Sequence, residues 1–359
     1  MMKYYSILFL FFTASLSTLG QAPKYSNEFL AIGTGARAKA LGNSFVAISD
    51  DATAGYWNPA GLLRIDGDLQ VSLMHAEYFA GIAKYDFGAV AFPIDTMSTI
   101  AFTYIRFGVD DIPNTTQLID ADGNINYDRI TSFSTADNAF LFSYARKMKI
   151  PGLSVGANVK VVRRIIGSFA NAWGFGLDVA AQYRKDNWQF GAIFRDVTGT
   201  FNAWNYTLDD EFIEVLERTG NELPTNGLEV TVPKLIIGGA WGKPLNSNFD
   251  ILAEIDMDLT FDGKRNTLIS SDFVSIDPHV GVELGFKRVV YIRMGVNNFQ
   301  FATDQFDKKT LKVDPNIGLG LKLGHFYIDY ALTNIGSASG ALYSNVFSLK
   351  FDIYKKNKA

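Results

Sequence analysis

The chain offers few residue combinations that could perform covalent or metal chemistry. Cysteine is absent and only three histidines occur among 359 residues, which excludes disulfides, zinc–thiolate sites and cysteine nucleophiles. The sequence contains no nucleophile elbow of the Gly-x-Ser-x-Gly type, no His-Glu-x-x-His pair and no phosphate-binding P-loop. We therefore expect that the protein is not an enzyme and holds no cofactor or metal.

Two short motifs resemble ligand sites only weakly. Gly33-x-Gly35-x-x-Ala38 is similar to a dinucleotide fingerprint, but no βαβ unit follows, so turn glycines are the better interpretation. Asp120-x-Asp122-x-Asn124 is similar to a calcium loop, yet the glycine and glutamate that such a loop needs later are missing. A polar surface loop is the default interpretation of that segment.

A row of acidic residues is the most concentrated set of charges. Glu254, Asp256 and Asp258 occupy alternate positions and would share one face of a strand. The cations Lys160, Lys287 and Arg293 could compensate them from other predicted strands. We interpret these six residues as a charge network, with a path for cations or polar solutes as the alternative. The net charge of −4 argues against a nucleic-acid partner.

The elements that would position these residues are strands. Apolar and polar residues alternate over many segments, as in Leu153–Val161 and Phe249–Phe261, which is typical of strands with one buried face. Fourteen strands are predicted, near residues 69–81, 83–94, 99–108, 137–146, 153–165, 172–184, 187–198, 233–243, 249–262, 274–287, 289–298, 311–323, 326–335 and 345–354. Most connections are short at one end and long at the other, which favours a transmembrane barrel over a soluble sandwich. Long loops face outward in such barrels, so we expect 114–135 and 200–231 outside the cell.

The first residues have the features of an export signal. A basic start precedes a short apolar run, and small residues follow at 18 and 20, so we expect a signal peptide over residues 1–20. The mature chain would then be a barrel at 69–359 preceded by a leader at 21–68. We expect the bacterial outer membrane as its location, with membrane lipid as its surroundings.

The leader does not alternate and is expected to fold as a hatch inside the barrel. Residues 36–41 favour a short helix that Gly42 ends, and Asp50 and Asp51 could cap a second helix. Arg37 would need a carboxylate if buried, for which Asp50, Asp51 or the Glu254–Asp258 face are candidates. The residues that we assign to this structural motif are Gly35, Ala36, Arg37, Gly42, Asp50, Asp51, Trp57, Asn58, Pro59 and Gly61.

These leader residues, together with Val46–Ala54 and Tyr56–Leu62, resemble the leader of the PorV/PorQ family of outer-membrane proteins of Bacteroidetes. The resemblance implies a fatty-acid transporter type of fold, with fourteen strands and an N-terminal hatch. It implies an accessory role in an envelope complex, that of type IX secretion, with translocon or other envelope proteins as partners. The alternative is an outer-membrane transporter that passes a hydrophobic small molecule through lumen and hatch.

Overall fold

The computed structural model describes residues 26–119, 123–303, 308–335 and 343–355, so the predicted signal peptide lies outside the described residues. In chain order the strands are β1 (Leu69–Tyr78), β2 (Ala83–Pro93), β3 (Ser98–Asn114), β4 (Thr131–Lys147), β5 (Leu153–Ile166), β6 (Ala170–Lys185), β7 (Trp188–Arg195), β8 (Thr200–Tyr206), β9 (Gly227–Thr231), β10 (Lys234–Pro244), β11 (Phe249–Thr260), β12 (Ile269–Ser270), β13 (Ser275–Phe286), β14 (Val290–Thr303), β15 (Lys309–Leu323), β16 (Phe326–Thr333) and β17 (Ser344–Ile353).

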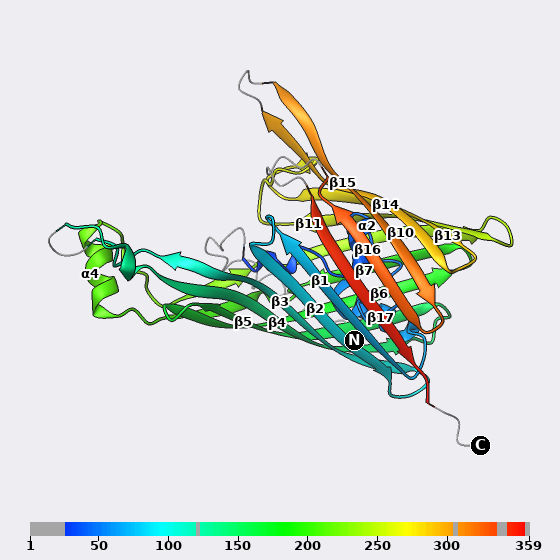
Figure 1. Ribbon diagram of the computed structural model, residues 1–359. Coiled ribbons are helices and arrows are strands. Elements are labelled where there is room, and N and C mark those ends of the chain that lie inside the picture. The colour runs from blue at the N-terminus through cyan, green and yellow to red at the C-terminus, as the bar shows by residue number, and fades with distance from the viewer. Residues whose placement is uncertain (1–25, 120–122, 304–307, 336–342, 356–359) are drawn as a thin grey trace.

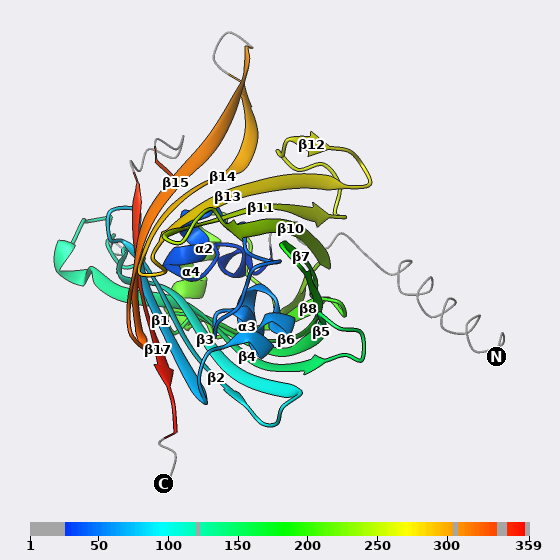
Figure 2. The ribbon, with the colours of Figure 1, turned by 90° about the vertical axis from the view of Figure 1, so that its right-hand side faces the viewer.

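These strands form one closed antiparallel barrel (Figures 1 and 2). β1 pairs with both β2 and β17, which closes the sheet. β7 and β8 both pair with β6 and are two parts of one barrel strand, and β9 continues into β10 in the same way. β12 is a two-residue strand in a loop. The predicted barrel of 14 strands is therefore confirmed.

The alternation of side chains fits a barrel whose outside contacts lipid. On β5, for example, Val159 is half exposed on the outer face, while its neighbours Asn158 and Lys160 are buried on the inner face. Apolar side chains are exposed in the same way around the wall, and an outward apolar band is the mark of an outer-membrane barrel. Among the described helices, none is long and apolar enough to cross a membrane.

The two ends of the barrel differ, as the loop lengths predicted. β3 and β4 are 17 residues long, and their pairing continues to Asn114 and Thr131. The segment 114–135 is thus partly strand rather than loop, because a bulge with Asp111 in the left-handed region hides the alternation. Segment 200–231 likewise contains β8, β9 and α4 (Asp210–Arg218). Asp209 caps α4, whose Phe212 ring stacks on Phe169 in the β5–β6 turn.

The leader lies in the lumen. Its elements are η2 (Glu28–Leu30), α2 (Ala36–Ala40), α3 (Ala54–Trp57) and η3 (Pro59–Arg64), and Figure 2 shows α2 and α3 enclosed by the wall. The alanines of α2 and α3 are fully buried. The wall has glycine where the leader approaches most closely: a Cβ on Gly295 would lie 2.1 Å from the Leu41 carbonyl carbon, and one on Gly156 would lie 2.5 Å from the Ala60 nitrogen. We use the word hatch for residues 26–68.

Candidate lumenal site

Arg37 joins the hatch to the barrel wall. Its Nε and Nη2 donate to Glu283 on β13 at 2.9 and 3.1 Å, and its Nη1 donates to Asp50 at 2.8 Å. Arg293 on β14 donates to the same Glu283 at 2.6 Å and to Asp329 at 2.5 Å. Burial opposes the charge of Arg37, but Glu283 and Asp50 outweigh it, so the pKa of Arg37 is raised. We call Arg37, Asp50, Glu283, Arg293 and Asp329 the latch.

Among the carboxylates predicted as partners of Arg37, Asp50 forms an ion pair with it, whereas Asp51 pairs with another residue. Its carboxylate contacts Lys350 on β17 at 3.2 Å and accepts from the Thr53 nitrogen at 2.9 Å. Burial opposes ionisation, but Lys350 and the Thr53 hydroxyl outweigh it and the pKa of Asp51 is lowered. The sequence could not show this, because Lys350 lies 299 residues away in the chain.

The Trp57-Asn58-Pro59 turn is a packing and hydrogen-bonding element. Trp57 donates to the Thr34 carbonyl at 2.9 Å, and Pro59 begins η3. The Asn58 amide donates to Val46 O at 2.9 Å and to Ala181 O on the wall at 3.0 Å, while its Oδ1 accepts from Ala60 N. The other small residues of the motif are also in close contact with their surroundings. The backbone N–H of Gly35 donates to Met74 Sδ, and that of Ala36 donates to Ser348 Oγ. Gly61 packs against Ser49 and Gly42 against Val296, with no room for a Cβ.

The acidic row on β11 binds the hatch backbone instead of the predicted cations. Asp256 accepts from the amides of Phe45 and Val46 at 2.7 and 2.9 Å, and Glu254 accepts from Ala47 N at 2.7 Å. A hatch turn therefore presents its free N–H groups to two wall carboxylates, which satisfies donors that would otherwise be buried without partners.

The remaining members of the predicted charge network fall into separate groups. Asp258 pairs with Lys234 and lies 3.7 Å from His279. Lys160 contacts Asp178 at 3.1 Å and Asp196 at 2.6 Å, with all three residues buried. Lys287 is not in the lumen. It lies in the exposed turn after β13 with φ 51°, because it is one residue beyond the end of the strand.

The wall is interrupted between β7 and β8. Pairing with β6 runs to Phe194 opposite Val179 and resumes at Phe201 opposite Phe175. Residues 195–200 therefore stand opposite only 176–178, which makes a large bulge. On the other side, pairing stops at Arg195–Lys234 and resumes at Thr200–Thr231. Residues 196–199 thus lie outside the regular ladder; we call them the wall break.

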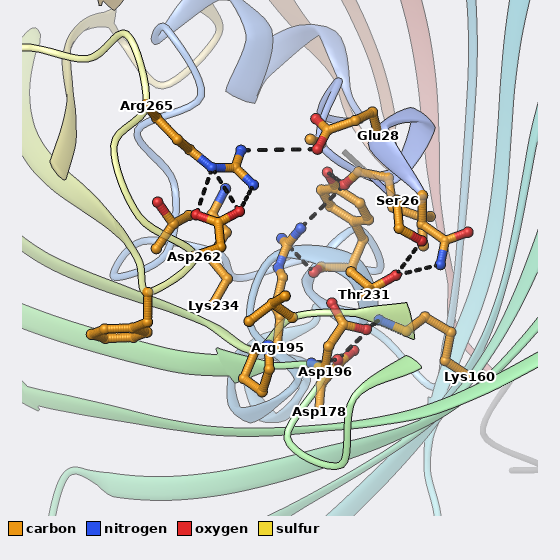
Figure 3. A pocket seen from close by; sticks show the side chains of 18 of the residues that line it. Ser26, Glu28, Lys160, Asp178, Arg195, Asp196, Thr231, Lys234, Asp262 and Arg265 are labelled. Atoms are coloured by element: carbon orange, nitrogen blue, oxygen red, sulfur yellow. Dashed lines mark hydrogen bonds and ion pairs between the residues drawn. The ribbon is translucent and has the colours of Figure 1, made fainter. Parts of the chain in front are cut away.

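A cavity of about 80 Å³ lies between the wall break and the hatch (Figure 3). Its apolar lining includes Leu30, Tyr56, Leu141, Val232 and Phe261, and its polar lining includes the residues labelled in Figure 3. Next to it is a vestibule of about 880 Å³, which shares Asn27, Glu28, Ala31, Lys234 and Arg265 with the cavity. Phe79 and Asn298, which line the vestibule, lie at the end of the barrel where the long hairpins project. The vestibule and the cavity therefore form a path from that end of the barrel to the wall break.

Arg195 is the least compensated cation in this cavity. Its side chain is nine-tenths buried, lies 4.4 Å above the Tyr56 ring, and donates to Leu30 O and Tyr56 O. Its Nε has no hydrogen-bond partner, and among the described residues no carboxylate lies within 4.0 Å of it. A buried guanidinium in this state favours an additional acceptor.

Arg195, Asp196 and Asp178 are not among the site residues predicted from the sequence. The available signal was the run Arg195–Thr200, where a polar Asp-Val-Thr-Gly-Thr stretch stops the alternation of the preceding strand. Within the described residues, no group of three or more histidine, aspartate or glutamate side chains could hold a metal ion. Asp120 and Asp122 of the calcium-like segment lie outside those residues.

Comparison with known proteins shows similarity at the level of fold. No family model matches the chain. No curated protein matches it either. Among solved structures, the CymD monoaromatic hydrocarbon channel gives a TM-score of 0.55 at 11% identity and covers 90% of this chain and 98% of that chain. The Ralstonia pickettii toluene transporter TbuX gives a TM-score of 0.52 at 12% identity, and the match covers 90% of this chain and 99% of that chain. The Pseudomonas putida toluene transporter TodX gives a TM-score of 0.51 at 12% identity, and the match covers 92% of this chain and 98% of that chain.

These similarities concern the whole barrel, because each alignment spans nearly the full length of both chains. The expected resemblance to the fatty-acid transporter fold is therefore confirmed, whereas the comparisons give no support to the PorV/PorQ family or to Bacteroidetes. The chain has the fold of outer-membrane hydrocarbon transporter barrels.

Proposed function

We propose that the protein is an outer-membrane transporter that passes small hydrophobic or amphipathic molecules from the vestibule, through the cavity, to the wall break. The observation that carries this proposal is the cavity itself, which lies between hatch and wall next to Asp196, where the ladder of the wall is interrupted. The similar structures are described as a monoaromatic hydrocarbon channel and toluene transporters, which supports a small ring compound as substrate class.

The lining of the cavity indicates an amphipathic substrate. Tyr56, Leu141 and Phe261 offer apolar contact, while Arg195 offers an unused donor. A volume of about 80 Å³ is well below the 300–1,000 Å³ of typical ligand pockets. Passage therefore requires local movement, for which segment 196–199 has fewer ladder bonds to break than any regular strand.

The test compares benzoate with toluene, which share a ring and differ in the carboxylate. Uptake into proteoliposomes should be measured for the intact protein, for Arg195→Met and for Arg146→Met. Arg146 is an exposed arginine at the short-turn end of β4 and serves as the matched control. We expect Arg195→Met to reduce benzoate uptake about tenfold or more, since a hydrogen bond to a charged group contributes about 1.5–3 kcal/mol, and to spare toluene uptake. Absence of protein-dependent uptake of either compound would refute the proposal.

An accessory role in type IX secretion stays a prediction from the leader sequence. The comparisons favour the transporter instead. Co-purification in mild detergent would test the accessory role, because a stable translocon partner should appear with the intact protein.

A further inference from the structure

The lipid-facing side of β1, β2 and β3 carries charges where the rest of the wall is apolar. Outward-facing residues can be counted from the short-turn end of each strand. The fourth is apolar on β5 (Val159), β11 (Ile255), β13 (Val280) and β15 (Ile317), and each of these is at least 36% exposed. On β1, β2 and β3 the fourth outward residue is His75, Asp86 and Arg106, respectively.

Outward positions beyond the fourth also carry charges: Glu77 on β1, Lys84 on β2 and Asp110 on β3. We call these six residues the ionic patch. His75 Nδ1 lies 2.7 Å from Asp86, and Lys84 Nζ lies 3.1 Å from Asp110. Arg106 lies 3.7 Å from Asp86 and 3.6 Å from Asp110. The side chains of the patch remain 28–56% exposed, so these pairs face outward and are not covered by the barrel.

Lipid tails are a poor environment for such a patch. A single charge on the lipid face costs about 2–4 kcal/mol near the bilayer midplane and about 0–1 kcal/mol near the interface. The apolar band under the patch has three outward residues on each strand, such as Ile100, Phe102 and Tyr104 on β3, whereas β11 has six from Phe249 to Leu259. A protein surface that supplies polar contacts would remove this mismatch.

The patch is complementary to itself. Two copies inserted in one membrane with the same orientation can be related only by an axis along the membrane normal, so residues of equal height meet. Asp86 and Arg106 are direct neighbours on β2 and β3. With the axis between these strands, Asp86 faces Arg106 of the second copy. Lys84 faces Gly108 of the second copy and has Asp110, the next outward residue of that strand, beside it. Each acid of β2 and β3 then has a base of the second copy beside it.

We propose that the outer face of β2 and β3 is the interface of a two-fold dimer of this chain within the outer membrane. The partner is a second copy, and the contact is an ionic patch above a narrow apolar band. This proposal is independent of the transported substrate, since none of its residues lines the cavity or the vestibule.

Single cysteines can test the interface directly, because the chain has none of its own. Tyr104→Cys places a thiol on the outer face just below Arg106, and Val282→Cys places one at a 40% exposed outward position on β13 as the control. Because Tyr104 faces Gly88 of the second copy across the axis, the two thiols lie on either side of it and need a short bismaleimide spacer to join them. This reagent should give a cross-linked dimer for Tyr104→Cys in intact outer membranes and at least tenfold less for Val282→Cys. Heat-modifiable gel mobility confirms that each variant is folded.

Charge variants on the Tyr104→Cys background separate the ionic contact from random collision. Arg106→Asp should reduce the dimer at least tenfold, and Asp86→Arg combined with Arg106→Asp should restore it, because the exchange recreates both pairs. Equal cross-linking at both cysteine positions, no dimer, or an adduct between Tyr104→Cys and a different protein would overturn the proposal. A monomer mass for the intact protein in native mass spectrometry from mild detergent would also contradict it.

Discussion

Removing the Arg37 side chain should release the hatch from the wall. Arg37→Ala deletes three hydrogen bonds to Glu283 and Asp50. Loss of one partner of a buried pair costs about 3–5 kcal/mol. Glu283 keeps Arg293, and Asp50 is one-third exposed, so both carboxylates retain compensation. We therefore expect Arg37→Ala to destabilise the docked hatch by about 2–3 kcal/mol, which is less than that full cost. This corresponds to a rise of about 30- to 150-fold in the population of undocked hatch.

Planar-bilayer recording of the purified protein measures this population as the frequency of conducting events. A barrel of fourteen strands is too wide for its own side chains to fill, so a displaced hatch should admit ions. Arg163→Ala is the matched control, because Arg163 faces outward over the Trp173 ring and does not touch the hatch. If Arg37→Ala is as silent as the intact protein, or if Arg163→Ala opens the barrel equally, the latch does not hold the hatch.

Two further predictions concern the hatch. Gly295→Ala should displace it and raise conductance, since the new Cβ would lie 2.1 Å from Leu41, whereas Gly88→Ala, with its nearest atom at 3.6 Å, should stay silent. Burial lowers the pKa of Lys39 to about 8, with Asp314 acting in the opposite direction. The unfolded chain then binds more protons between about pH 8 and 10, so stability should rise with pH in that window. Thermal unfolding should show this rise in the intact protein and a smaller one in Lys39→Met.

Strand periodicity was sufficient to predict the barrel because the membrane acts on every outward residue in the same way. Val159 faces lipid and Asn158 faces the hatch for a reason that is local to β5, so the sequence contains it. The ends of strands were less predictable. β8 was placed in a loop, because its outward residues follow a bulge that changes the phase of the alternation.

The partners of the buried charges could not be predicted from periodicity. Alternation shows that Glu254 and Asp256 face inward, but not that they meet the amides of residues 45–47, which depends on how the hatch is placed in the lumen. The same holds for Lys160, whose partners Asp178 and Asp196 are brought together by the wall break. Facing direction is a local property, whereas pairing is a property of the closed barrel.

The buried charges form two groups. One group joins the hatch to the wall and the other holds the wall break, so each group opposes a different movement. Expelling the hatch would break the latch, the Asp51–Lys350 pair and the amide contacts of Asp256, all of which join hatch to wall. Shifting residues 196–199 would disturb the contacts of Asp196 and one backbone hydrogen bond, from Val197 N to Leu177 O on β6 at 2.9 Å, because the segment has otherwise left the ladder. Under the proposed transport function, a small molecule in the cavity would therefore meet less resistance through the wall than through the hatch. This difference favours a hatch that stays in place as the floor of the path, with the wall break as the part that moves.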